Sequence, residues 1–228
     1  MRASLYPSAD AAVADIEEGA TVLVGGFGGV GQPAELIEAL CRSSVAELTI
    51  VSNNAGSGND ALSALLLTGR VRKITCSFPR SSNSWVFEDL YRAGKIELDL
   101  VPQGTLAERL RAAGAGIGAF YCPTAAGTAL ATQKESRTID GRDYLLEYPL
   151  KGDVALVKAS TADQAGNLVY RKTARNFGPV MATAADMTIA QVMNIVPTGS
   201  LDPEVVVTPG IYVNRLVQCE AAAEAVTL

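Results

Sequence analysis

The sequence predicts an α/β fold: an open, mostly parallel sheet flanked by helices, with a β-rich second half. Through residue 112, short apolar runs alternate with segments of helical periodicity. Strands separated by helices of this size pair in parallel through right-handed crossovers. The chain has 228 residues, of which 48% are hydrophobic, so it can bury a sizeable core. We therefore expect one domain over residues 1–228, with ligand sites at the carboxyl ends of the strands.

Helix signals punctuate the first half of the chain. Ser8 and Asp60 are favourable N-cap residues, Pro33 suits the start of a helix, and Gly19 and Gly94 suit helix ends. Between these signals, short apolar runs are typical of buried strands. The expected helices are residues 8–18, a segment from residue 33, and residues 60–67, 84–91 and 105–112. The expected strands are residues 20–24, 48–51, 71–76 and 96–101.

Strand patterns dominate the second half. Residues 114–127 are dense in Gly, Ala, Pro and Thr, which predicts a loop. The turn Ala165-Gly166-Asn167 predicts a hairpin between residues 153–160 and 168–172. The sequence shows no internal repeat and no clear linker, so we interpret this half as part of the same domain. The remaining strands are expected at residues 142–148, 187–196, 205–208 and 211–217.

The composition excludes several kinds of catalytic and metal site. The chain has no histidine, so it cannot build a Ser-His-Asp triad, a Cys-His dyad or a zinc site with imidazole ligands. A catalytic base must be a carboxylate, Lys, Tyr or Cys, or must come from another chain. The cysteines are far apart and form no CxxC pair, so we expect reduced thiols and no metal site. They are Cys41, Cys76, Cys122 and Cys219.

The charge balance argues against nucleic-acid and membrane partners. The formal net charge is -5 and the pI is near 4.9, with no block of basic residues. The N-terminal segment carries charges where a signal peptide needs an apolar run. No stretch approaches the roughly 20 apolar residues of a membrane span. We therefore expect a soluble, cytoplasmic protein.

A glycine-rich turn between an expected strand and helix is the strongest local signal. Backbone amides at such a turn, together with a helix N-terminus, favour a phosphate or another anion. Glycines 26, 28 and 31 fit the GxGxxG spacing, but the next strand ends in Ser52-Asn53-Asn54 without an acidic residue, which argues against NAD. A tight turn without a ligand is the alternative. The turn consists of Gly25, Gly26, Phe27, Gly28, Gly29, Val30 and Gly31.

Amide side chains follow two other expected strands. Asn53 and Asn54 could bind a polar ligand, although Asn is also an ordinary turn former. Gln103 offers a neutral donor near the start of a helix, which suits an oxyanion pocket for an acyl transition state. A capping box between Thr105 and Glu108 is a second interpretation of the same segment, and it is compatible with the first.

A fourth segment combines cationic and amide side chains. Lys172, Arg175 and Asn176 lie within five residues of one another and could bind a carboxylate or phosphate group. A charged surface turn is an equally simple interpretation. The composition supports both interpretations equally.

Six motifs in this order resemble the alpha subunits of 3-oxoacid CoA-transferases of the glutaconate/succinyl-CoA-transferase class. The resemblance runs from residue 25 to residue 215 and is far more specific than any glycine motif. It is strongest toward members acting on 3-oxoadipate, through Cys76-Ser77-Phe78-Pro79-Arg80. The motifs are GGFGGVGQP, VSNNAG, VPQGTLAERLRAAGAGIGAFYCPT, KGDVALVKA, DQAGNLVYRKTARNF and TPGIYVNR.

The resemblance implies a CoA-transferase (NagB/RpiA-like) fold and ping-pong transfer of CoA from succinyl-CoA to a 3-oxoacid, 3-oxoadipate first. The CoA thioester would be a substrate, with no permanently bound cofactor. The nucleophilic glutamate would belong to a beta subunit in an α2β2 assembly, because its motif does not occur here. This chain would supply residues 25–31 for CoA binding and Gln103 for the oxyanion hole. The alternatives are the alpha subunit of an acetate/acetoacetate CoA-transferase and a non-catalytic CoA-binding partner chain.

One loop departs from the pattern of the resembling family. Members commonly read PTGYGT where this chain has Ala125 and Ala126 between Pro123-Thr124 and Gly127-Thr128. Residues 81–87 also lack the GENK form seen in other members. If the first loop touches the acyl group, the substrate would differ from 3-oxoadipate.

Overall fold

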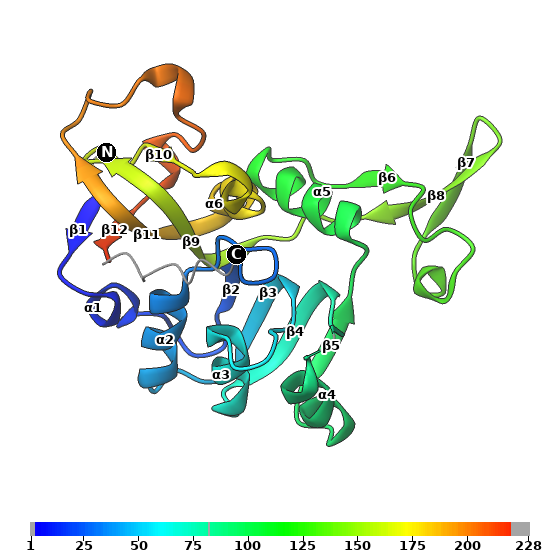
Figure 1. Cartoon of the computed structure of the whole chain (residues 1–228). Helices are drawn as coiled ribbons and strands as arrows, with labels where there is room; N and C mark the ends of the chain where they lie inside the picture. The colour runs from blue at the N-terminus through cyan, green and yellow to red at the C-terminus, as the bar shows by residue number, and fades with distance from the viewer. Residues whose placement is uncertain (1–2, 82, 220–228) are drawn as a thin grey trace, which may run out of the picture.

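The computed structural model describes residues 3–81 and 83–219 and places most strands in one nine-stranded sheet (Figure 1). The strand order is β1-β12-β11-β9-β2-β3-β4-β5, and β10 pairs with β9. All neighbours are parallel except β10 and β9, as the strand–helix alternation predicts. The strands are β1 (Ser4–Tyr6), β2 (Thr21–Val24), β3 (Leu48–Asn54), β4 (Val71–Phe78), β5 (Glu97–Leu100), β9 (Gly152–Asp163), β10 (Leu168–Val169), β11 (Ala185–Val196) and β12 (Arg215–Gln218).

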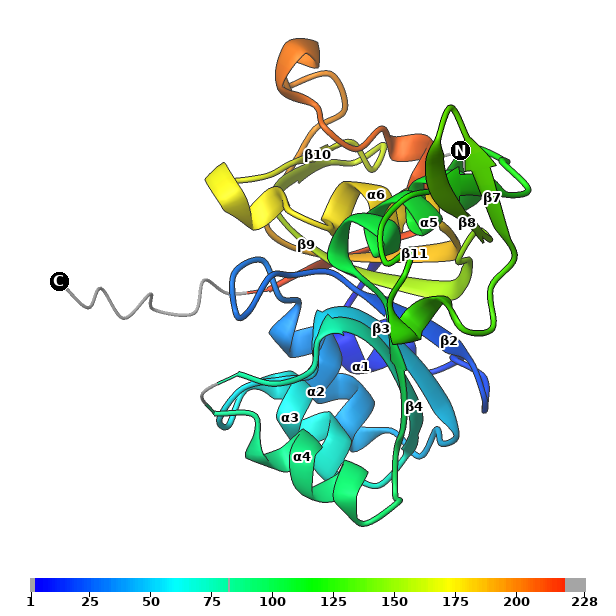
Figure 2. The same ribbon diagram turned by 90° about the vertical axis from the view of Figure 1, so that its right-hand side faces the viewer.

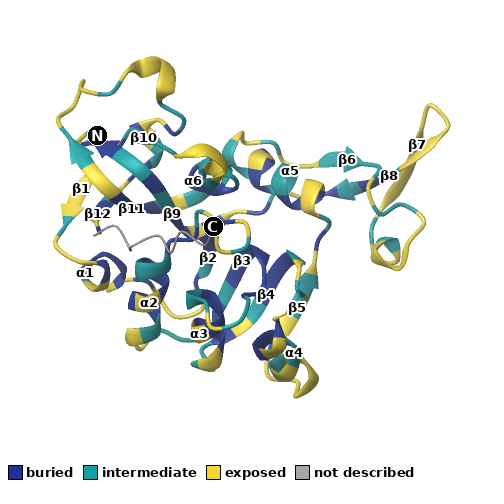
Figure 3. Ribbon diagram, viewed as in Figure 1, coloured by how far each residue is buried: buried dark blue, intermediate teal, exposed yellow. Residues whose placement is uncertain are grey.

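Helices cover both faces of this sheet because its strands are apolar on both faces. Side chains such as Val22 and Ile50 point to one face and pack with α1–α4, whereas Leu23 and Val51 point to the other and pack with α5 and α6. The central strands are accordingly buried (Figure 3). The helices are α1 (Ala9–Val13), α2 (Ala34–Arg42), α3 (Ala61–Leu67), α4 (Trp85–Arg92), α5 (Gln103–Gly114) and α6 (Gly178–Thr183).

Two predicted helix caps are confirmed by hydrogen bonds. Ser8 accepts from the Ala11 backbone N–H at 3.1 Å, and Asp60 accepts from the Ser63 N–H at 2.7 Å. The helix after Ser8 is shorter than predicted and ends at Val13, five residues before the expected end at residue 18. The start of this helix was therefore easier to predict than its end.

A second, three-stranded antiparallel sheet projects from the body as an arm (Figures 1 and 2). Its order is β6-β8-β7, with β6 (Phe120–Cys122), β7 (Ser136–Ile139) and β8 (Arg142–Glu147). All four residues of β7 are exposed, whereas Glu147 at the root is buried and pairs with Lys134. The strand expected at residues 142–148 is confirmed, but the expected loop at 114–127 contains β6.

Several elements in the last third of the chain differ from those predicted. The hairpin between β9 and β10 is confirmed, with Leu168 opposite Ala162, but its second strand ends at Val169 and not at residue 172. The strand expected at residues 205–208 is wrong, because only Thr208 forms a single bridge, to Leu168. Strand β1 and helix α6 were not predicted. Short 3-10 helices fill the turns: η1 (Ala129–Ala131), η2 (Lys172–Arg175), η3 (Pro203–Val205) and η4 (Gly210–Tyr212).

The described part of the chain contains neither a membrane-crossing helix nor a metal-binding cluster. No helix within residues 3–81 and 83–219 is long and apolar enough to cross a membrane. The same residues contain no group of three or more His, Cys, Asp or Glu side chains that could hold a metal ion. The four cysteines are free thiols, and Cys76 and Cys219 are buried.

Candidate functional site

The parallel sheet brings three of the predicted segments to one edge. Strands β2, β3 and β5 run in the same direction, so their carboxyl ends meet there. The glycine turn follows β2, Asn53 lies near the end of β3, and Gln103 begins α5 three residues after β5. Asn53 and Asn54 belong to β3 itself, which is three residues longer than predicted, so they are not turn formers.

The glycine turn is a small hairpin anchored to the central strand. Gly25 donates its N–H to the Leu156 carbonyl of β9 at 2.9 Å. Phe27 and Val30 exchange two backbone hydrogen bonds of 3.0 and 3.2 Å, which places Gly28 and Gly29 at the tip. The side chains of Phe27 and Val30 are both 51% exposed, so the hairpin presents apolar surface at its rim.

Residues 172–176 pack directly against this hairpin. Gly31 has φ of +73°, and a Cβ at this position would come within 2.3 Å of the Ala174 carbonyl oxygen. Asn176 donates from Nδ2 to the carbonyls of Val30 at 2.9 Å and Thr173 at 3.0 Å, and its Oδ1 accepts from the Phe177 N–H at 2.7 Å. Two segments that lie far apart in the sequence therefore form one unit.

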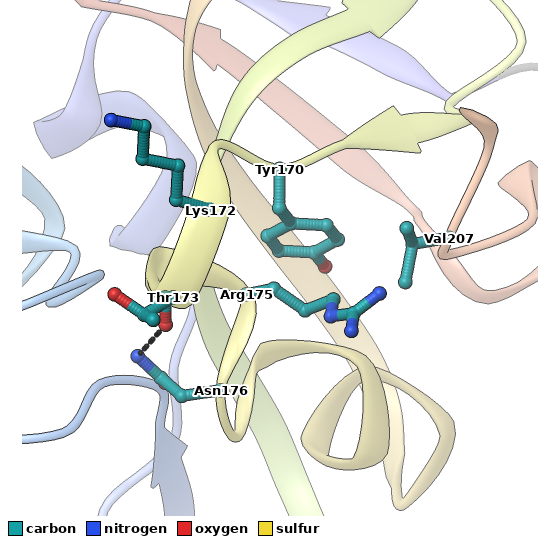
Figure 4. A pocket seen from close by; sticks show the side chains of 6 residues that line it. All are labelled: Tyr170, Lys172, Thr173, Arg175, Asn176 and Val207. Atoms are coloured by element: carbon teal, nitrogen blue, oxygen red, sulfur yellow. Dashed lines mark hydrogen bonds between the residues drawn. The ribbon is translucent and has the colours of Figure 1, made fainter.

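Residues of helix η2 line two cavities at this unit. Figure 4 shows the first of them. Lys172 points away from Tyr170, whereas Arg175 extends toward Tyr170 and Val207. Lys172 also has φ of +50°, a strained conformation for a lysine. The first cavity, of about 670 Å³, is lined by Tyr170, Lys172, Thr173, Arg175, Asn176 and Val207. The second, of about 500 Å³, is lined by Gly29, Val30, Gly31, Lys158, Ala159, Ser160, Arg171, Lys172, Thr173, Ala174 and Met193.

Neither cavity has an acidic side chain among these lining residues, and both have cationic ones. Buried polar groups stabilise the wall of the first cavity. Tyr170 shares a hydrogen bond of 2.8 Å with Thr208, and burial raises the pKa of the Tyr170 phenol to about 12. The arrangement can bind an anion, but the described residues provide no carboxylate nucleophile in either cavity.

Gln103 and Asn53 form a second unit at the same edge. Gln103 donates from Nε2 to Asn53 Oδ1 at 2.6 Å. Asn53 is only 3% exposed, so it offers a fixed acceptor, whereas Gln103 is exposed. An amide nitrogen carries two hydrogens, so one donor of Gln103 remains for a ligand. Of the predicted site residues, these two are joined, and no hydrogen bond among the described residues links them to Lys172, Arg175 or Asn176.

The interpretation of Thr105 and Glu108 as a capping box is wrong. Helix α5 begins two residues earlier, at Gln103, with Pro102 as its N-cap. Thr105 is buried in the first turn, with Oγ1 3.9 Å from Cys122 Sγ, and Glu108 pairs with Arg111 instead. The early start is what leaves Gln103 free to reach Asn53.

Sequence reasoning did not single out Lys158, Ser160, Tyr170 or Met193, which also line the cavities. Lys158 interrupts the apolar face of β9, two residues beyond Leu156. That interruption was visible in the sequence. The others carried no comparable signal, because their positions depend on how β9, β10 and β11 come together.

Comparison with known proteins gives concordant results. A family model described as coenzyme A transferase matches residues 6–219. The chain is 59% identical over 218 residues to a 3-oxoadipate CoA-transferase subunit of Pseudomonas putida, covering 96% of this chain and 94% of that protein. It is 52% identical to a succinyl-CoA:3-ketoacid coenzyme A transferase subunit of Xanthomonas campestris pv. campestris, covering 94% and 88%. The crystal structure of an acyl-CoA transferase apoenzyme from Escherichia coli O157:H7 superimposes with a TM-score of 0.85 at 25% identity, covering 96% of this chain and 47% of that one.

Proposed function

Because this chain belongs to the coenzyme A transferase family, we propose that it is the alpha-type subunit of an enzyme that moves CoA from succinyl-CoA to a 3-oxoacid. The similarity to a 3-oxoadipate enzyme and to a succinyl-CoA:3-ketoacid enzyme supports this substrate class. The first acceptor to test is 3-oxoadipate. CoA thioesters are substrates in this proposal, and no bound cofactor is required.

The single observation that carries the mechanism is the hydrogen bond between Gln103 and Asn53. Attack on a thioester carbonyl creates an oxyanion, which fixed hydrogen-bond donors stabilise. Asn53 accepts one Nε2 hydrogen of Gln103 and thereby orients the second. Gln103 would therefore donate to the oxyanion without reorganising, while Gly25–Gly31 and the cationic side chains of Lys172 and Arg175 would bind CoA.

The nucleophile in this proposal is a glutamate of a partner subunit. Its carboxylate attacks the thioester carbonyl, expels the CoA thiolate and forms an acyl anhydride. The thiolate then attacks the glutamyl carbonyl, which releases succinate and leaves CoA on the glutamate as a thioester. The same two steps in reverse, with the 3-oxoacid carboxylate as attacking group, yield the new CoA thioester. No group in this sequence needs to act as a proton shuttle.

Two observations support a partner. The two cavities lack carboxylates among their described lining residues. The similar Escherichia coli chain is about twice as long, because the match covers only 47% of it. The partner would then correspond to the unmatched half, and an α2β2 assembly is the stoichiometry that we propose.

The experiment compares the purified chain, a candidate beta chain and their mixture, with succinyl-CoA and a panel of 3-oxoacids. We expect no turnover by either chain and turnover by the mixture, with the highest kcat/KM for 3-oxoadipate. Borohydride reduction after addition of acyl-CoA should modify the partner and not this chain. Turnover by the purified chain, or a modified glutamate in it, would contradict the proposal. A preference for acetoacetate would change the substrate and not the reaction.

A further inference from the structure

Lys158 occupies an unusual position in the central strand β9. Val154 and Leu156 point to the same face of the sheet and are buried against the helices α1–α4. Lys158 continues this series and is half-buried. Parallel strands covered on both faces are normally continuous apolar runs, so an ammonium group here needs a reason.

The backbone around Lys158 borders a gap in the sheet. The pairing of β2 with β9 ends at Val24 and Leu156, and the pairing of β10 with β9 begins only at Thr161. Along residues 157–160, no strand in the described part of the chain pairs with β9 on that side. The cavity of about 500 Å³ lies at this gap, with Lys158 on one wall and Gly29–Gly31 on another.

Lys158 has no acidic partner within residues 3–81 and 83–219. Other lysines do have one: Lys151 lies 2.6 Å from Asp186, and Lys134 pairs with Glu147. Glu35, at the start of α2, accepts from Gln191 Nε2 at 3.5 Å and faces Cys219, as Lys158 also does, but no ion pair joins Glu35 to Lys158. A half-buried ammonium without a counterion is costly, and a bound anion would remove that cost.

We propose that Lys158 binds an anionic oxygen group of the substrate inside this cavity. The identity of that substrate rests on the proposed function, which offers two sources: a phosphate of CoA or the distal carboxylate of a dicarboxylic acyl group. Both present oxygen atoms that accept charge-assisted hydrogen bonds from an ammonium group. Arg171 and Lys172 also line this cavity, so Lys158 is one of three cationic side chains there.

The test is equilibrium titration of the alpha–beta complex with CoA, with 3′-dephospho-CoA and with succinate, on wild type and Lys158→Met. Loss of one charge-assisted hydrogen bond should weaken binding of the affected probe by about 10- to 100-fold. Weaker binding of CoA but not of dephospho-CoA assigns the 3′-phosphate, and weaker binding of both assigns the diphosphate. Weaker binding of succinate assigns the acyl carboxylate.

The controls separate charge from folding. Lys158→Arg should keep affinity within a few-fold, and Lys95→Met, which removes an exposed lysine outside the cavity, should leave it unchanged. If Lys158→Met does not fold, Met193→Glu places a competing carboxylate in the same cavity, with Met193→Gln as its neutral match. That carboxylate should weaken binding of the same probe that Lys158→Met affects.

Unchanged affinity for every probe in Lys158→Met, or no binding of any probe by wild type, would overturn the proposal. Binding is measured without turnover. A complex that binds these probes through Lys158 but transfers no CoA would therefore contradict the proposed function and not this inference.

Discussion

The two units at the sheet edge are held together by different forces. The glycine hairpin and η2 fit by shape, because Gly31 leaves only enough room for the Ala174 carbonyl, and the Asn176 side chain joins the two segments by hydrogen bonds. Gln103 and Asn53 are joined by one hydrogen bond from an exposed side chain. The first unit should therefore govern the stability of the fold and the shape of the binding site. The second should govern the rate of the chemical step.

The two units also differ in electrostatic character. Cationic side chains border the cavities around η2, whereas neutral amides form the second unit. Cations favour a ligand that is already anionic, and fixed neutral donors favour a charge that develops during reaction. Binding and catalysis should thus be separable by mutation.

Gly31→Ala should have the largest effect. The new Cβ would meet the Ala174 carbonyl oxygen at 2.3 Å, and φ of +73° is unfavourable for alanine. We expect a loss of about 2–5 kcal/mol in the free energy of unfolding, from overpacking and backbone strain together. Chemical denaturation of the purified chain measures it.

Gly29→Ala is the matched control, because a Cβ at Gly29 meets nothing within 4 Å and its φ is not positive. Its free energy of unfolding should stay within about 1 kcal/mol of wild type. Equal stability of the two alanine variants would show that the close approach of Gly31 and Ala174 does not exist in solution.

Gln103→Ala should affect the rate more than the stability. Gln103 is exposed, but its removal leaves the buried Asn53 Oδ1 without its donor, so the free energy of unfolding should fall by about 1–3 kcal/mol at most. Loss of an oxyanion donor should lower kcat of the assembled enzyme by about 10²-fold or more, with a smaller effect on KM. Steady-state kinetics with succinyl-CoA measures both, and an unchanged kcat would remove Gln103 from the reaction centre.

A double-mutant cycle tests whether Asn53 acts through Gln103. Asn53→Ala should lower kcat by about tenfold in wild type, because Gln103 loses its orientation. The same substitution in Gln103→Ala should have little further effect. Fully additive losses would instead indicate that Asn53 contacts the substrate independently, as the sequence alone suggested.

Tyr170 should make the η2 unit sensitive to alkaline pH. Burial raises the pKa of its phenol from an ordinary value of 10.0 to about 12, so the folded chain keeps the proton that the unfolded chain loses. This contribution to stability is complete below about pH 10 and declines between about pH 10 and 12, by at most about 2–3 kcal/mol.

Denaturation at pH 8 to 11 should show a steeper decline in wild type than in Tyr170→Phe, because the raised pKa values of Cys76 and Cys219, each about 12, cause a decline in both proteins. The matched control is Tyr148→Phe, because Tyr148 is 60% exposed at the root of the arm, and it should keep the wild-type slope. An identical slope in all three proteins would mean that Tyr170 titrates in the folded state as it does when unfolded.

The sequence predicted local structure better than the site geometry. Helix caps at Ser8 and Asp60 and the β9–β10 hairpin depend on neighbouring residues, and these predictions are confirmed. The contact of Gly31 with Ala174 joins residues far apart in the chain, so no local pattern reveals it. Only part of the arm was predicted, because β6 is short and the residues around it favour a loop.

The family resemblance pointed to candidate site residues, and the structure shows which contacts those residues make. Gln103 was marked as an oxyanion donor, but its hydrogen bond to Asn53 depends on where α5 begins. Lys158 lies within a motif of the family yet was not singled out, because its lack of an acidic partner in the described residues is a three-dimensional property. Their roles in the reaction remain predictions.

Ala125→Gly should have the smallest effect, and it acts on the loop that departs from the pattern of the resembling family. Cys122, just before this loop, contacts Thr105 in the first turn of α5. Ala125 has φ of +68°, so an alanine here is strained where glycine is not, and the variant should gain about 1 kcal/mol in stability. Ala126 has no positive φ, so Ala126→Gly should lose about 0.5–1 kcal/mol. Changes of opposite sign in the free energy of unfolding of the two variants would show that this chain tolerates backbone strain at Ala125. Changes of equal sign would contradict the backbone geometry of the loop.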